Sequence, residues 1–138
     1  MYALCSSYVS SSGSEDLTKH HQACASALTS ATTYNHTQTA IWNDTIISTL
    51  LQTLISETAS PNGEAPAYKF MVNSTIIQHT APSSAAATEA GEAPGRRGMH
   101  SAAGAYWNNE KDGMWSFKYE GGEKRGMDVV VMVMWVGL

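Results

Sequence analysis

An unbroken run of eight apolar residues near the end of the sequence, Val129 to Val136, restricts the possible folds most strongly. A helix that spans a bilayer needs about twenty such residues, so this run is too short to cross a membrane. It predicts a buried strand from Gly126 to Val136. A strand without polar positions is usually covered on both faces, so other parts of the fold must supply that cover.

The clearest amphipathic pattern predicts a helix over residues 38–57, with Thr37 as its N-cap. Apolar residues recur there at spacings of three and four, which produces one wide apolar face. The sequence Ser60-Pro61-Asn62-Gly63 ends the helix. The predicted apolar face consists of Ile41, Trp42, Ile46, Ile47, Leu50, Leu51, Leu54 and Ile55.

A weaker helix is predicted from about Leu17, with Asp16 as its cap, because Leu17, Cys24 and Leu28 share one helical stripe. Four strands follow the second helix, and Asp-Gly within residues 108–113 indicates a hairpin turn between the second and third. The fold class is therefore α+β, with two N-terminal helices packed on a four-stranded, mostly antiparallel sheet. The predicted strands are 68–79, 98–107, 114–120 and 126–136.

The chain of 138 residues suits a single domain, which we place at residues 15–138. Residues 1–14 are rich in serine and are expected to form a flexible N-terminal segment. Residues 80–97 form a low-complexity loop of Ala, Ser, Thr, Glu, Gly and Pro. A loop of this length inside a compact domain requires a reason.

Charge and targeting signals exclude several classes of protein. The formal net charge is −4, whereas a nucleic-acid binder would show a basic face. The first residues lack the basic and apolar regions of a signal peptide, so a cytosolic location is expected. Cys5 and Cys24 are then free thiols, and the sequons at Asn35, Asn43 and Asn73 are chance matches.

No motif in the sequence indicates catalysis, a metal or a cofactor. His20 and Cys24 stand four residues apart, but a metal site needs at least one more ligand, so we interpret them as a helix surface with a partly buried thiol. A small enzyme that uses His100 near Asp112 or Glu110 is the alternative from another class. It lacks a recognisable nucleophile or paired carboxylates.

The predicted strand at 98–107 is built largely of Ala, Gly and Ser, which let another backbone approach closely. An open strand edge of this kind can receive an extended peptide through main-chain hydrogen bonds. A small-residue strand packed beneath a bulky helix explains the same composition equally well. The residue pattern by itself leaves both interpretations open.

Several strings resemble the Tctex-type dynein light chain family, in order and over residues 34–138. The ordered set is more specific than any one string, and the loop at 80–97 is longer than in the animal members. The strings are Tyr34-Asn35-His36-Thr37 followed by Trp42, Tyr68-Lys69-Phe70, Met99-His100-Ser101-Ala102 leading to Tyr106-Trp107, Asp112-Gly113, and Trp135-Val136-Gly137-Leu138.

The resemblance implies a non-catalytic, strand-swapped homodimer that binds the dynein intermediate chain, and in some members cargo, in a groove between the exchanged strand and the second helix. The loop at 80–97 would then span the dimer interface. A dynein-independent hub, or an axonemal or intraflagellar light chain, remains the alternative. The implied peptide-binding residues are Met99, His100, Ser101, Ala102, Ala103, Gly104, Ala105, Asn43, Ile47 and Leu50, and Gly98, Tyr106 and Trp107 are implied at the dimer interface.

Overall fold

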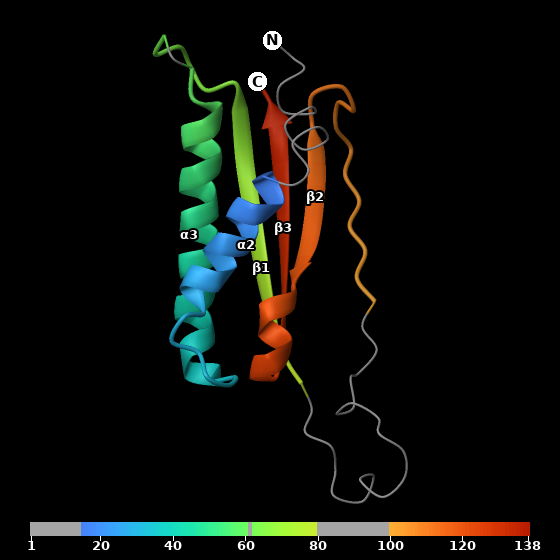
Figure 1. The fold of residues 1–138 in the computed structure, drawn as a ribbon. Helices are drawn as coiled ribbons and strands as arrows, with labels where there is room; N and C mark the ends of the chain where they lie inside the picture. Colours follow the sequence, from blue (N-terminus) through green and yellow to red (C-terminus); the bar gives the residue numbers. More distant parts are fainter. Residues whose placement is uncertain (1–14, 61, 80–99) are drawn as a thin grey trace, which may run out of the picture.

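The protein is described here by a computed structural model that covers residues 15–60, 62–79 and 100–138. In these residues one layer of two α-helices packs on one layer of antiparallel sheet (Figure 1). The predicted N-terminal segment 1–14 and the loop 80–97 lie outside the described residues. The α+β class and the predicted order of helices before strands agree with the structure.

The two helices form where the sequence pattern predicts them, at Glu15–Ala27 (α2) and Thr39–Thr58 (α3). A 3₁₀ turn, η1, at His36–Gln38 leads into α3. Thr37 is not the N-cap. The N-cap residue of α3 is Gln38, which makes no side-chain capping hydrogen bond. Asn35 caps η1, where its Oδ1 atom accepts the Thr37 backbone N–H at 3.0 Å.

Three strands form the sheet of the described residues, in the order β1-β3-β2 with antiparallel pairing throughout. The second of the four predicted strands, at 98–107, is absent at residues 100–107, which form no ladder. Ala and Gly have low strand propensity, so these residues need a partner strand to become a strand themselves. The strands are β1 at Tyr68–Gln78, β2 at Gly113–Tyr119 and β3 at Met127–Gly137, with a 3₁₀ helix, η2, at Glu120–Arg125 before β3.

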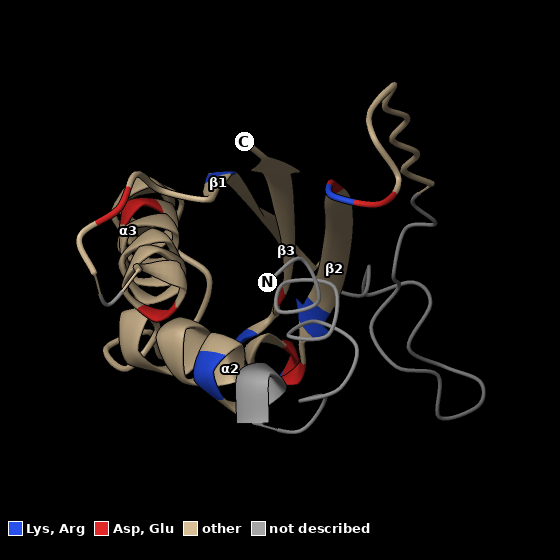
Figure 2. Cartoon of the chain, turned by 90° about the horizontal axis from the view of Figure 1, so that it is seen from above, with Lys and Arg blue, Asp and Glu red and all other residues tan. Residues whose placement is uncertain are grey.

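The core lies between the helices and one face of the sheet, and Figure 2 shows both helices on that same side. Side chains of β3 alternate between buried and partly exposed along the whole strand. The prediction that both faces of this apolar strand are covered is therefore wrong for a single chain. The helix-facing residues of β3 are Met127, Val129, Val131, Val133 and Trp135.

His20 and Cys24 belong to this core rather than to a helix surface. Cys24 is fully buried, and His20 is only 6% exposed. The His20 ring lies 5.1 Å from the ring of Trp115 on β2. Trp115 also stacks on Phe117 of the same strand, with ring centroids 4.9 Å apart.

Three hydrogen bonds fix the ends of β3. The His79 backbone N–H donates to the Gly126 carbonyl at 2.9 Å, and the Leu138 backbone N–H donates to the Ala67 carbonyl at 2.9 Å. The Gly137 backbone N–H donates to Oδ1 of Asp112 at 2.8 Å. The turn that contains Asp112 is thus attached to the end of β3, and the residues before it run separately from β2 (Figure 1).

Candidate functional site

The outer edge of β1 is the first element of the candidate site. β1 pairs with β3 along eleven residues on one side, and no other described strand lies along its other side. α3 runs beside this edge, in the direction opposite to β1 (Figure 1). A strand edge next to a helix can accept an extended chain, with its backbone on the strand and its side chains against the helix.

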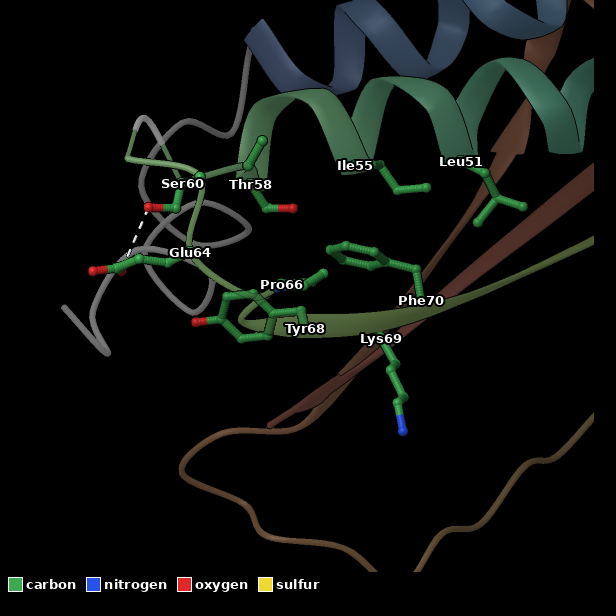
Figure 3. A pocket seen from close by; sticks show the side chains of 11 residues that line it. Leu51, Ile55, Thr58, Ser60, Glu64, Pro66, Tyr68, Lys69 and Phe70 are labelled. Atoms are coloured by element: carbon green, nitrogen blue, oxygen red, sulfur yellow. Dashed lines mark hydrogen bonds between the residues drawn. The ribbon is translucent and has the colours of Figure 1, made fainter.

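A groove of about 600 Å³ lies between α3 and β1, and we call it the α3–β1 groove. Leu51 and Ile55 project from the helix toward the ring of Phe70 on the strand (Figure 3). The side chain of Lys69 points away from the groove, toward the opposite side of the sheet. The main lining residues are Leu51, Ile55, Thr58, Pro66, Tyr68 and Phe70, so the groove is mostly apolar.

Leu51 and Ile55, which line the groove, belong to a stripe of α3 that lies one residue after the core stripe. Trp42, Ile46, Leu50 and Leu54 face the core, and the next residue in each case falls on the adjacent side of the helix. Leu50, implied above as a groove residue, is only 1% exposed and belongs to the core. The stripe beside it consists of Asn43, Ile47, Leu51 and Ile55.

Two buried polar atoms on these same elements have no hydrogen-bond partner among the described residues. They are Oδ1 of Asn43 on α3 and Oγ of Ser74 on β1. Ser74 lies on the helix-facing side of β1, where its neighbours Val72 and Ile76 pack against the core. A buried polar group without a partner costs about 1–3 kcal/mol, so these two atoms lower the stability of the single chain.

The segment implied to bind peptide is exposed and extended. His100, Ser101, Ala102, Ala103, Gly104, Ala105 and Tyr106 are all exposed, and Trp107 is partly buried. Trp107 donates its Nε1–H to Asn109 at 3.1 Å. Gly98 and Met99 lie outside the described residues. The structure therefore does not bring this segment to Asn43 and Ile47 within one chain.

The face of the sheet opposite the helices is also partly exposed, and we call it the open sheet face. Both described helices lie on the other side of the sheet (Figure 2). Apolar side chains dominate this face on the central strand, where Val136 is 43% exposed. The open sheet face consists of Lys69, Met71, Asn73, Thr75 and Ile77 of β1, Met114, Ser116 and Lys118 of β2, and Asp128, Val130, Met132, Met134 and Val136 of β3.

Charged groups gather at one end of the open sheet face. Asp128 lies 3.0 Å from Nε2 of His79 and 3.1 Å from Nζ of Lys118, and Lys118 also pairs with Glu123. Burial alone would raise the pKa of Asp128. The hydrogen bonds and charges of His79 and Lys118 outweigh burial and lower the pKa below its ordinary value.

The residues considered for catalysis are not arranged for it. His100 is exposed, and both carboxylate oxygens of Asp112 accept backbone N–H groups, from Gly137 and from Asn108. Burial raises the pKa of the Cys24 thiol to about 12, so it is a poor nucleophile. Within the described ranges no three His, Cys, Asp or Glu side chains are placed to hold a metal, and no helix is long and apolar enough to span a membrane.

Sequence reasoning missed the strand side of the groove. Tyr68 and Phe70 were recognised as strand residues, and Leu51 and Ile55 as part of an apolar helix face. The signal was available, because eight apolar residues on one helix exceed what a single core stripe can bury. Ile55 is in fact 59% exposed, which indicates a second contact surface on α3.

Comparisons with known proteins agree with this architecture. The model of the Tctex-1 family matches residues 15–136. A curated relative named "Dynein light chain Tctex-type", from Schizosaccharomyces pombe, is 36% identical over 108 residues, which covers 78% of this chain and 79% of the relative. The residues that the family model matches include both helices and nearly all of the sheet. The chain therefore belongs to the Tctex-1 family of Tctex-type dynein light chains.

Proposed function

We propose that the protein is a non-catalytic light chain of the cytoplasmic dynein motor complex. In this role it is a homodimer that binds extended segments of the dynein intermediate chain, and of cargo proteins, during microtubule-based transport. Its place is then the cytoplasm, on the microtubule cytoskeleton. The observation that carries the proposal is the outer edge of β1, which lies beside α3 and has no other strand along it in the described residues.

Strand exchange explains why one chain has both an open edge and a segment without a partner. Residues 98–107 of one copy would add to the β1 edge of the other, and would become a strand only there. The loop 80–97 is long enough to connect the two copies at modest entropic cost, because closure entropy grows slowly with loop length. The guest peptide would then lie between the exchanged strand and α3.

The composition of the exchanged segment fits this arrangement. Ala102, Ala103 and Gly104 have small side chains, so a guest backbone and the α3 wall can both approach closely. Asn43 lies on the stripe of α3 that would face the guest peptide. Apolar guest side chains would contact Ile47, Leu51 and Ile55.

The open sheet face supports a dimer independently. A strand as apolar as residues 129–136 of β3 is usually covered on both faces, and the helices cover only one of them. A specific interface buries about 800 Å² per partner. A second copy that exchanges a strand along β1 is placed to cover the neighbouring face as well.

A proline substitution in the exchanged segment tests the proposal. Ala103→Pro removes one backbone N–H and restricts the chain, whereas Ala103→Ser keeps the N–H and a small side chain. We expect the proline variant to lose both the dimer in sedimentation and the NMR shift changes on titration with intermediate-chain peptides. The serine variant should resemble the parent protein. A proline variant that dimerises and binds normally would contradict strand exchange.

The alternative roles differ in their binding partners and not in the geometry of the groove. A dynein-independent hub and an axonemal or intraflagellar light chain would use the same groove. Affinity purification of the full chain from cell extract, followed by mass spectrometry, should recover a dynein intermediate chain. Recovery of other partners without any dynein subunit would argue for the hub.

A further inference from the structure

Three methionines form a continuous row across the open sheet face. Met71 of β1 is directly opposite Met134 of β3, and Met134 is directly opposite Met114 of β2. Directly opposed side chains on one face of an antiparallel sheet have Cβ atoms about 4.5–5.5 Å apart. Val133 and Trp135, on either side of Met134, face the helices. The row therefore lies on the side away from them.

The row is open to solvent in a single chain. Met71 is 48% exposed and Met114 is 39% exposed, whereas Met134 between them is partly buried. Met127, on the same strand as Met134, faces the core and is fully buried. The chain thus carries exposed and protected methionines within one sheet, so reagents in solution can distinguish them.

We propose that Met71, Met114 and Met134 are an oxidation site through which hydroperoxides control self-association. This inference rests on the proposed homodimer, with a second copy of the chain as the body that covers the open sheet face. The row lies beside the β1 edge at which strand exchange is proposed, so one partner would contact both. The partner that covers the open sheet face is therefore another copy of the chain rather than an unrelated apolar protein.

The chemistry needs only a hydroperoxide and the thioether. A sulfur lone pair attacks one peroxide oxygen, the O–O bond breaks, and a proton moves to the departing oxygen. The sulfur loses two electrons and becomes a sulfoxide, and the peroxide is reduced to water or an alcohol. No additional reductant or metal is required, and enzymatic reduction of the sulfoxide would reverse the change.

Oxidation converts an apolar contact into a polar one, whose sulfoxide groups lose hydration when the neighbouring copy binds. Met134, at the centre of the row, has Met132 and Val136 on either side along β3, and neither donates a hydrogen bond to a sulfoxide oxygen. The donors Lys69, Asn73 and Ser116 lie on the outer strands, beside Met71 and Met114. A twofold dimer contains the row twice, so the effect is doubled. We expect the dimer dissociation constant to rise at least tenfold when the row is oxidised.

The test uses the full chain with Cys5→Ser, treated with hydrogen peroxide and mapped by peptide mass spectrometry. The dimer constant is then measured by analytical ultracentrifugation. Met71 and Met114 should oxidise first in dilute, monomeric protein and slowly in concentrated dimer, whereas Met127 should stay reduced. Methionine sulfoxide reductase should restore the original dimer constant.

The matched control is the triple variant Met71→Leu, Met114→Leu and Met134→Leu, since leucine is apolar and of similar volume. It keeps Met99, so an effect of oxidation at that residue would persist in it. Peroxide should leave its dimer constant unchanged, and equal weakening of parent and variant would overturn the assignment. An untreated chain that stays monomeric would contradict the homodimer and this inference together. A dimer whose dissociation constant does not change when the row is oxidised would refute the oxidation site but not the homodimer.

Discussion

Adjacent leucines on α3 provide the sharpest test of the groove. Leu50 is 1% exposed in the core, and Leu51 is a partly exposed wall residue of the α3–β1 groove. Truncation of a fully buried leucine to alanine costs about 2–5 kcal/mol, because a cavity remains. At this chain length a loss of about 3 kcal/mol lowers Tm by roughly 10 °C. Leu50→Ala should therefore lower stability strongly.

Leu51→Ala should have little effect on stability but should weaken peptide binding. It removes side-chain atoms that are already partly in water, so its cost to folding should stay below about 1.5 kcal/mol. A guest peptide that covers Leu51 would lose apolar contact worth about 1–2 kcal/mol, which weakens binding roughly five- to thirtyfold.

Urea unfolding measures the loss of stability in both variants, and peptide titration measures the loss of affinity. All measurements use one protein concentration, because the stability of a dimer depends on concentration. Equal destabilisation by both substitutions, or full affinity in Leu51→Ala, would refute the assignment of these residues.

Three further measurements address individual groups. Asp112→Ala removes the acceptor of two backbone N–H groups, at Asn108 and Gly137. It should lower the unfolding free energy by about 1.5–3 kcal/mol in urea titrations. An unchanged urea midpoint would contradict a stabilising role for these two hydrogen bonds. The lowered pKa of Asp128 stabilises the folded chain above about pH 4, its unfolded value, and this contribution is lost as pH falls through the folded pKa. Asp128→Asn should thus flatten the acid side of the stability curve below about pH 5, and a curve parallel to that of the parent would disprove this. In a Cys5→Ser background Cys24, whose pKa is about 12, should react with iodoacetamide only on unfolding, and rapid labelling of the native protein would show that the core is open.

Local patterns predicted the elements that are stable by their own contacts. The stripes at Cys24 and Leu28 and at Trp42, Ile46 and Leu54 became the helix side of the core, and the alternation in residues 68–78 became β1. The predicted strand at 98–107 does not form at residues 100–107, because Ala and Gly have low strand propensity and no described strand pairs with them. The resemblance to a family, rather than the residues themselves, implied a partner chain for this segment.

Site residues were harder to predict than elements. A periodicity of 3.6 identifies the apolar side of a helix but not where the core ends and a second surface begins. Leu50 and Leu51 differ by about 100° around α3, and only the position of β1 decides which of them is buried. The groove also needs Phe70, which lies nineteen residues later in the chain, so no local pattern connects it to Leu51.

The three hydrogen bonds at the ends of β3 have a consequence for folding accuracy. In most strands a shift of one residue exchanges apolar and polar faces and is penalised at once. From Val129 to Val136 such a shift replaces Val or Met by Val, Met or Trp, so hydrophobicity hardly opposes misalignment. The bonds at Gly126, Gly137 and Leu138 fix the register of the strand at its two ends. Loss of these bonds would yield chains that are compact but have β3 paired in a shifted register. NMR would show this as several signals for one amide, with no loss of sheet content.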